Sequence, residues 1–271
     1  MPHSNLTPQS PPKKDYLWLQ LRDLPYFRAM LRAVEAEFYR DYDLPTPTLD
    51  LGCGDGHFAT IAFDRKLEVG LDAWESTLQE ARRSGGYKHL VLADGAKMPF
   101  DEGYFASAVS NSVLEHIPHI DHVLVETARV LRTNAPFLFC VPNPGYLTKL
   151  SIAAILRRIG LNKLAATYTE WFRVMSHTHH SNPPEIWKIR LEHAGFIIEK
   201  WWHYFSPQAL HMLEWGHYFG APTLLAHALF KRWIIAPQRW NLFLTEIMVR
   251  KHVIAAPDER GTYTFYVARR V

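Results

Sequence analysis

The sequence predicts an α/β fold with a doubly wound, mostly parallel sheet of seven strands and helical insertions. Short apolar runs of strand length recur between residues 48 and 142, and helical patterns lie between most of them. Two further apolar runs follow at 196–205 and 262–270. The runs are mostly continuous rather than alternating, as expected for strands that helices cover on both faces.

Composition narrows the classes of function. The 271 residues are 48% hydrophobic and 21% charged, which supplies a packed core and excludes global disorder. The formal charge is only +3, and no basic cluster interleaves with aromatic residues, so no nucleic-acid partner is expected. Cys53 and Cys140 lie in apolar runs without metal-ligand spacing, which indicates buried thiols in a reducing compartment.

The ends of the chain suggest a location and a domain organisation. No apolar stretch reaches about 18 residues, and the N-terminus lacks the apolar region of a secretory signal. We therefore expect a cytoplasmic protein without a spanning helix. The Pro- and Ser-rich residues 1–15 are expected to be a mobile tail, and residues 16–271 a single domain.

The first half of the chain alternates between helix and strand. Apolar residues recur on one face from Phe27 to Phe38, which predicts a helix over Asp23–Arg40 with Asp23 as its cap and Pro25 in the first turn. A strand follows at "TLDL". Further strands are predicted at 67–72, 89–94, 105–112 and 136–142, with helices at 75–83 and 121–132 between them.

The second half interrupts this rhythm twice. Residues 143–183 hold a helical segment and a His-rich stretch, and are expected to form a cap inserted after the fifth strand. A helix at 185–194 and a strand at 196–205 resume the pattern. An aromatic helical insertion at 206–261 then precedes a closing strand at 262–270.

The segment "LDLGCGDG" (49–56) places three glycines directly after the first strand. Gly52, Gly54 and Gly56 would let the chain turn tightly from strand to helix and present backbone N–H groups to a ligand. Taken alone, the segment fits a ligand-binding turn and an unused tight turn about equally well.

Three more predicted strands end in polar residues, and this resolves the ambiguity. Asp72 ends "LEVGLD", Asp94 ends "HLVLAD", and Asn111 lies at the end of "FASAVSNS". In a Rossmann-like sheet, ligands bind beyond the carboxyl ends of the strands. An acid at the tip of the second strand can accept hydrogen bonds from two ribose hydroxyls.

These motifs resemble those of class I S-adenosylmethionine-dependent methyltransferases, in particular the small-molecule branch around the ubiquinone and menaquinone methyltransferases. The resemblance covers about 45–142, with weaker support from 184–205 and 262–270. "LDLGCGDG" is similar to the family's first motif and "LDAW" to its acidic second motif. "ADGAKMPFDEGYFASAVSNSVLEHI" resembles the third and fourth motifs, and "VLRTNAPFLFCVPN" the helix and fifth strand.

The resemblance implies S-adenosylmethionine as cofactor and assigns roles by position. Gly52 and Gly54 would lie under the methionyl part, with Asp50 helping to hold its ammonium group, and Gly56 is also expected to bind the cofactor. Asp72 would bind the ribose hydroxyls and Ala73 would lie beside the adenine. Asp94 would accept from the adenine amino group, Gly95 would allow close approach, and Asn111 would lie near the sulfonium. No metal is implied.

Two other functions remain open on the residues alone. A nicotinamide-dependent oxidoreductase would need GxGxxG, whereas the spacing here is GxGxG and His57 follows Gly56. A non-catalytic module that binds the cofactor would share every motif quoted above. Methyl transfer to a small, fairly hydrophobic metabolite is the function we expect.

Several residues could act as a base for such a transfer. His116, expected at the start of the helix beside the methyl end, is the predicted catalytic residue, although it could equally cap or pack that helix. Glu115 is a second candidate. The imidazoles of "SHTHHS" (176–181) are expected to face water in a polar loop, with substrate contact as the alternative and a metal site least favoured.

The aromatic segment 205–240 should govern the partners. It has few charges between Glu214 and Lys231. Its helices could cover the sheet edge, pair with another copy of the chain, wall an apolar pocket, or rest on a membrane surface beside Lys231 and Arg232. A small hydrophobic molecule, and either a homodimer or peripheral membrane contact through 205–240, are the expected partners.

Overall fold

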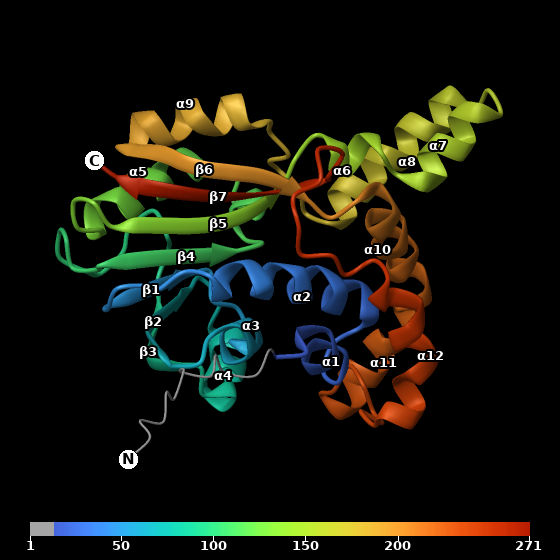
Figure 1. Ribbon diagram of the computed structural model, residues 1–271, viewed down its shortest axis with the longest axis horizontal. Coiled ribbons are helices and arrows are strands. Elements are labelled where there is room, and N and C mark those ends of the chain that lie inside the picture. The colour runs from blue at the N-terminus through green and yellow to red at the C-terminus, as the bar shows by residue number, and fades with distance from the viewer. Residues whose placement is uncertain (1–13) are drawn as a thin grey trace, which may run out of the picture.

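A seven-stranded sheet in the order β3-β2-β1-β4-β5-β7-β6 forms the frame of the molecule (Figure 1). The computed structural model describes residues 14–271. Strands β1 to β5 pair in parallel, and β7 is antiparallel to both β5 and β6. The strands are β1 (Thr48–Leu51), β2 (Leu67–Asp72), β3 (Tyr87–Leu92), β4 (Ser107–Asn111), β5 (Pro136–Pro142), β6 (Phe196–Tyr204) and β7 (Tyr263–Arg270). The predicted doubly wound α/β class is confirmed.

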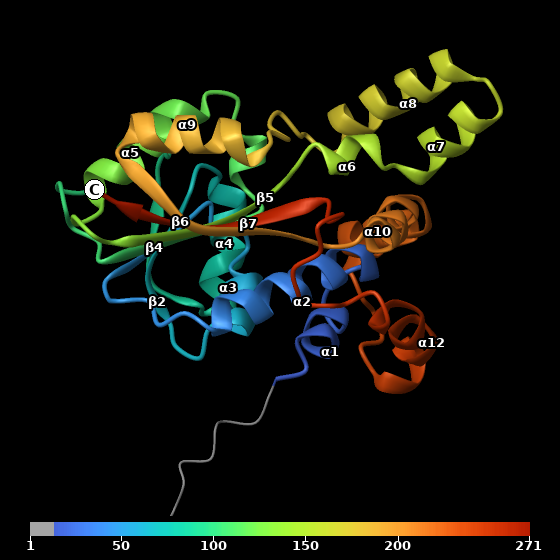
Figure 2. The same cartoon turned by 45° about the horizontal axis from the view of Figure 1, so that its top comes forward.

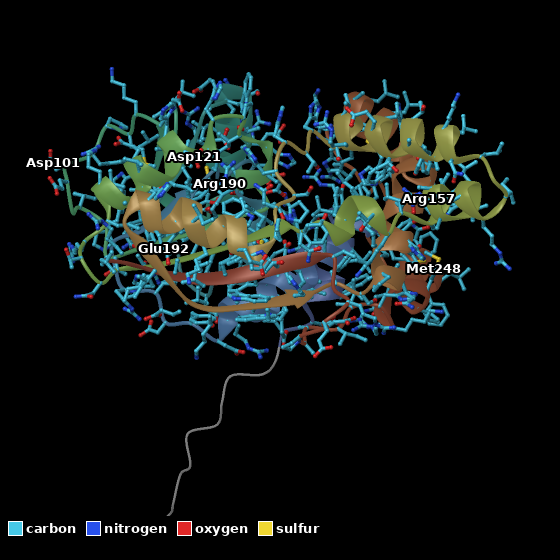
Figure 3. All side chains as sticks on the ribbon, turned by 90° about the horizontal axis from the view of Figure 1, so that it is seen from above. Asp101, Asp121, Arg157, Arg190, Glu192 and Met248 are labelled. Atoms are coloured by element: carbon cyan, nitrogen blue, oxygen red, sulfur yellow. The ribbon has the colours of Figure 1, made fainter. Side chains whose placement is uncertain are left out.

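Helices cover both faces of this sheet (Figure 2). One face carries α5 (Ile120–Val130) and α9 (Pro184–Ala194), which pack with the sheet in one apolar cluster. The other carries α2 (Tyr26–Arg40), α3 (His57–Ala62) and α4 (Glu75–Ser84) in a second cluster. Arg190 on α9 bonds Asp121 on α5 at 3.0 Å, and Figure 3 shows both above the sheet. Cys53 and Cys140 are buried free thiols in the structure.

The predicted insertions form two groups of helices. Helices α6 (Gly145–Thr148), α7 (Ser151–Arg158) and α8 (Asn162–Met175) follow β5, and α7 and α8 make a hairpin that projects from the sheet (Figure 1). Helices α10 (Pro207–Phe219), α11 (Ala221–Phe230) and α12 (Arg239–Arg250) precede β7. Helix α10 packs on α2, so the second insertion adjoins the N-terminal helices. None of the helices in the described part of the chain has the length and apolarity needed to cross a bilayer.

The start of the domain differs from the prediction. An additional helix, α1 (Tyr16–Leu21), is capped by Asp15, whose carboxylate accepts from the N–H of Trp18. Most of the predicted tail, residues 1–13, lies outside the described residues. Helix α2 begins at Tyr26 with Pro25 as its cap, so the prediction of Asp23 as cap is wrong. The proline disfavours helical backbone at the preceding residue, which delays the helix start.

Candidate functional site

The carboxyl ends of β1, β2 and β4 surround a cavity of about 320 Å³, here called the strand-end cavity. It lies where parallel sheets of this class bind ligands. Most of the predicted site residues line it: Asp50, Gly52, Gly54, Asp72, Ala73, Gly95, Asn111 and His116. Gly56 and Asp94 are not part of this lining.

The glycine turn after β1 needs its glycines for two different reasons. All three adopt left-handed backbone, with φ of +76° at Gly52, +53° at Gly54 and +72° at Gly56. A Cβ on Gly52 would lie 2.3 Å from a methyl of Val113, and one on Gly56 would lie 2.4 Å from Oγ of Ser84 on α4. A Cβ on Gly54 would meet nothing within 4 Å. Gly56 therefore serves helix packing, whereas Gly54 leaves bare backbone on the cavity.

Asp72 is buried at the end of β2 and is held rigidly. Its Oδ2 accepts from the N–H of Gly54 at 2.9 Å, and its Oδ1 accepts from the N–H of Trp74 at 2.9 Å and the hydroxyl of Thr77 at 3.0 Å. These bonds join the β2 end to the glycine turn. They also fix the orientation of a carboxylate that lines the cavity, as a ribose-binding acid requires.

Asp50 and Arg32 place opposite charges on the same cavity. Asp50 is buried and accepts from the hydroxyl of Tyr87 at 2.6 Å. Burial, together with the nearby Asp72, raises the pKa of Asp50 to about 7, although the Tyr87 bond and Arg32 act to lower it. Arg32, on α2, has a buried Nη1 without a hydrogen-bond partner among the described residues. The cavity thus offers an unpaired cationic donor next to a carboxylate.

Asp94 lies at the edge of the site. Strand β3 runs over Tyr87–Leu92 rather than 89–94, so Asp94 lies two residues past its end instead of at the tip. Asp94 is exposed, and its Oδ1 accepts from the N–H of Ala96 at 2.9 Å. Its neighbours Ala93 and Gly95 line the cavity. Contact between Asp94 and a ligand stays a prediction, since a side-chain rotation would have to bring it in.

Asn111 is tied into a buried polar network centred on Glu35. Its Nδ2 donates to Glu35 at 2.9 Å, and its Oδ1 accepts from the Cys140 thiol at 3.2 Å. Ser112 and Tyr204 donate to the same carboxylate at 3.2 and 2.7 Å. Burial raises the pKa of Glu35, and these donors act to lower it. The network fixes the β4 end from α2 and β6, two elements distant in sequence.

His116 lies in the 3₁₀ turn η1 (Leu114–His116), not at the start of a helix as predicted, because α5 begins only at Ile120. Its Nδ1 donates to the carbonyl of His177 at 3.0 Å. Burial lowers the pKa of His116, so the ring is neutral near pH 7. His116 lines the strand-end cavity, and its catalytic role stays a prediction.

The His-rich loop docks on η1 largely through backbone. The N–H groups of His179 and His180 donate to the carbonyl of Glu115 at 2.8 and 3.1 Å. The His180 ring donates to the carbonyl of Ile117 at 2.9 Å. The loop therefore connects the cap to the turn beside the cavity. No cluster of three or more His, Cys, Asp or Glu among residues 14–271 could hold a metal ion.

A second, smaller cavity adjoins the first. It has a volume of about 200 Å³, shares Ser112 and His116 with the strand-end cavity, and is here called the cap cavity. The rest of its lining comes from α2, η1, β5, α6, the His-rich loop, α10 and β7: Phe27, Arg28, Leu31, Glu115, Pro142, Tyr146, Ser176, Thr178, Leu213, His217 and Tyr263.

Arg32 and Glu35 were missed by the sequence analysis. Both belong to α2, which precedes the first motif and was interpreted only as a packing helix. A signal existed for Glu35, because Leu31, Glu35 and Phe38 follow one another on the buried face of the helix. An acid on such a face requires buried partners.

Comparison with known proteins identifies the family. Residues 49–139 match the family described as "Methyltransferase domain". Malonyl-[acyl-carrier protein] O-methyltransferase of Legionella pneumophila is 32% identical over 115 residues, which are 40% of this chain and 40% of the relative. Residues 49–139 thus match a methyltransferase domain, and the curated relative over this region is a methyltransferase.

Other relatives of this methyltransferase domain agree. A probable S-adenosylmethionine-dependent methyltransferase of Mycolicibacterium smegmatis is 29% identical over 154 residues, 56% of this chain and 52% of the relative. The chain thus aligns with only about half of each curated relative, or less.

Solved structures of methyltransferases share the fold across most of the chain. A SAM-dependent methyltransferase from Thermotoga maritima superimposes with a TM-score of 0.54 at 11% identity, covering 90% of both chains. The geranyl diphosphate C-methyltransferase of Streptomyces coelicolor gives 0.55 at 14%, covering 91% of this chain and 82% of that one. At these identities the likeness shows the fold.

S-adenosylmethionine is the cofactor of this family, and the residues of the strand-end cavity fit it. The cofactor is an adenosine joined to an amino acid that carries an ammonium and a carboxylate. Asp72, fixed by its bonds to Gly54 and Trp74, would bind the ribose hydroxyls. Asp50 would hold the ammonium, and the unpaired Nη1 of Arg32 would bind the carboxylate. Without that anion, a buried guanidinium donor would stay unsatisfied at a cost of about 1–3 kcal/mol.

Proposed function

We propose that this protein transfers the methyl group of S-adenosylmethionine to a small, fairly hydrophobic metabolite. The observation that carries the proposal is the combination of Asp72, Asp50 and Arg32 on one cavity, since it matches the two ends of this cofactor. When bound, the cofactor supplies a methyl group activated by a positive sulfur.

The protein's part in such a transfer is mainly alignment. A displacement at the methyl carbon needs the nucleophile, the carbon and the sulfur in line, and positioning of this kind supplies about 7–11 kcal/mol. The strand-end cavity and the adjoining cap cavity support that arrangement, because the first would hold the cofactor and the second offers space for the acceptor beside it. Phe27, Leu31, Tyr146, Leu213 and Tyr263 give the cap cavity an aromatic and aliphatic part beside its polar and charged residues, and this part supports a fairly hydrophobic acceptor.

The similar proteins are named for different substrates. One is a malonyl-[acyl-carrier protein] O-methyltransferase and another a geranyl diphosphate C-methyltransferase. We expect the acceptor specificity of this chain to depend on the cap cavity, whose lining comes both from the matched residues 49–139 and from the two insertions.

The oxidoreductase alternative fits the charges less well. A dinucleotide would place its pyrophosphate against the glycine turn. Here Asp50 and Asp55 line that part of the cavity, and their carboxylates would repel the phosphates. The non-catalytic module shares the cofactor site and differs only in lacking turnover.

Titration calorimetry separates these functions. We expect S-adenosylhomocysteine to bind with micromolar affinity, NAD not to bind, and Asp72→Ala to abolish the binding. Tight NAD binding would overturn the proposal in favour of an oxidoreductase. Binding of S-adenosylhomocysteine without any methyl transfer across a metabolite panel would favour the module.

A further inference from the structure

The cap cavity contains one chemical group that the fold itself does not use. Glu115 has an exposed fraction of only 4%, yet its Oε2 has no hydrogen-bond partner among the described residues. It lines the cap cavity together with Ser112 and His116, which separate that cavity from the strand-end cavity. A buried carboxylate oxygen without a donor is costly, and a ligand that brings a donor removes the cost.

The backbone around Glu115 is held firmly, so its position is defined. Its carbonyl accepts from the N–H groups of His179 and His180 on the cap loop. Burial raises the pKa of Glu115 to about 8, and the nearby Glu35 contributes in the same direction. Other titratable or charged groups that face the cap cavity are Arg28, His116, Tyr146, His217 and Tyr263.

His116 is less suited to take a proton from a molecule in this cavity. Its Nδ1 is committed to the His177 carbonyl, and its Nε2 lies 3.9 Å from Oε1 of Glu115, beyond hydrogen-bond distance. Burial lowers the pKa of His116, so the ring is a weaker base than free imidazole. Glu115 presents a carboxylate oxygen that no protein donor occupies.

We propose that the cap cavity binds the methyl acceptor and that Glu115 accepts, and then removes, the proton of its nucleophilic hydroxyl or amine. This rests on the proposed methyltransferase function and narrows its substrate class. The acceptor is a small, mainly apolar molecule with an O–H or N–H group. A carboxylate nucleophile does not use this base, because it has no proton to give, and Glu115 in its ionised form would repel it.

The chemical step balances without a further reactant. A lone pair of the acceptor oxygen or nitrogen forms a bond to the methyl carbon. The bond from that carbon to sulfur breaks, and its electron pair stays on sulfur, which becomes neutral. The acceptor's proton ends on Oε2 of Glu115 and is then lost to solvent. Such a base contributes about 10²- to 10⁴-fold to a rate.

The test begins with the wild-type protein saturated with S-adenosylhomocysteine. Saturation-transfer NMR would measure binding of four probes: 4-methylphenol, catechol, tyramine and benzoate. We expect at least one phenol or amine to bind and benzoate not to bind. Failure of S-adenosylhomocysteine to bind would reject the proposed function. If it binds but no phenol or amine does, only the acceptor-site proposal fails.

Variants then identify the base. For a probe that binds, Glu115→Gln should lower kcat with S-adenosylmethionine by about 10²-fold or more. It should leave the affinity for S-adenosylhomocysteine unchanged and remove the rise of kcat with pH that wild type shows. Glu102→Gln, an exposed acid on a turn, is the matched control. If His116→Gln removes the pH dependence and Glu115→Gln does not, His116 is the base.

The second insertion carries a separate, exposed apolar surface, here called the end face. Trp240 and Leu244 of α12 are 77% and 78% exposed, far more than core residues. Other exposed apolar side chains on α10, α11 and α12 extend it: Phe219, Leu224, Leu225, Leu229, Phe230, Phe243, Ile247 and Met248. Single exposed apolar residues are common, but a contiguous group marks an interaction site.

Basic residues surround this apolar group. Segment 221–256 has a single acid, Glu246, but five bases: Lys231, Arg232, Arg239, Arg250 and Lys251. Lys231, Arg232 and Lys251 form no ion pair within residues 14–271. Figure 3 shows Met248 of α12 at the same end of the molecule as Arg157 of the α7–α8 hairpin, opposite Asp101.

We infer that the end face rests on a membrane surface that contains anionic lipid. Apolar side chains bordered by unpaired cations match the interface of such a bilayer, whereas a second copy would bring like charges together. Flotation should recover the protein with vesicles of phosphatidylcholine plus phosphatidylglycerol, and much less with phosphatidylcholine alone.

Variants of the end face test this directly. Leu244→Asp should abolish flotation, and Val125→Asp, at an exposed site on α5, should not. Absence of wild-type flotation would contradict the inference. A dimer in sedimentation analysis that Leu244→Asp dissociates would assign the end face to a second copy instead.

Discussion

Replacing Arg32 by methionine should weaken the binding of ligands that carry the amino-acid part of the cofactor, and leave the binding of the adenosine part unchanged. Methionine keeps much of the apolar stem of arginine and removes the guanidinium, whose buried Nη1 has no protein acceptor. A hydrogen bond to a charged group contributes about 1.5–3 kcal/mol. We therefore expect the Kd for S-adenosylhomocysteine to rise roughly 10- to 150-fold.

The comparison ligand is 5′-methylthioadenosine, which has the adenosine part and lacks the amino-acid part. Arg32→Met should leave its Kd within about twofold of wild type, because the lost partner is the carboxylate. Asp72→Ala should weaken both ligands, since it acts on the ribose. Titration calorimetry at constant pH and ionic strength measures the affinities of wild type and both variants for the two ligands.

Two results would refute this reasoning. Equal weakening of both ligands by Arg32→Met would mean that the guanidinium shapes the cavity rather than binding the carboxylate. An unchanged affinity for S-adenosylhomocysteine would mean that Nη1 faces no anion. Thermal melting of the variant without ligand checks that the fold is intact.

Three further predictions follow from the same site. Binding of S-adenosylhomocysteine should weaken as pH falls below about 7, because Asp50 must release a proton to hold an ammonium. The Kd should rise by at most about tenfold for each pH unit, which calorimetry between pH 5.5 and 8 measures. Gly52→Ala should lower Tm strongly, since its Cβ would overlap Val113, whereas Gly54→Ala should cost only the strain of left-handed backbone, about 1 kcal/mol. Glu35→Ala should reduce the free energy of unfolding by about 3–5 kcal/mol, measured in urea, because it leaves buried donors unpaired.

Each of these has a control. Asp50→Asn should bind S-adenosylhomocysteine without the pH slope; a persistent slope would assign it to another group. The raised pKa of Asp50 also predicts a sign for stability: as pH rises from about 4 to 7, Asp50→Asn should lose less stability than the unliganded wild type. Some loss should remain in the variant, because burial also raises the pKa values of Glu35 and Glu115. A Tm of Gly54→Ala as low as that of Gly52→Ala, or a neutral Glu35→Ala, would contradict the packing and hydrogen-bond arguments.

The sequence predicted the elements that depend on local pattern. Strands β2 and β5 begin and end where the apolar runs do, and Asp72 lies at its predicted strand end. The bounds of β3 were wrong because β3 is an edge strand whose start follows from pairing with β2 rather than from its own apolar run. Asp94 was misplaced with it.

What the sequence could not show is the contribution of α2 to the site. Arg32 and Glu35 reach the strand ends only because α2 packs across the sheet, and nothing in the local spacing reveals that packing. Glu115 illustrates the same limit, because its residue type was visible but its unpartnered oxygen was not. Burial and hydrogen-bond accounting are properties of the folded chain.

The docking of the His-rich loop restricts how the two substrates can enter. The loop makes hydrogen bonds to Glu115, His116 and Ile117, and the last two line the strand-end cavity. A movement of the cap away from the sheet would therefore either break these hydrogen bonds or displace His116 and Ile117, which line the strand-end cavity. We therefore expect cofactor loading into the strand-end cavity and opening of the cap cavity to be coupled.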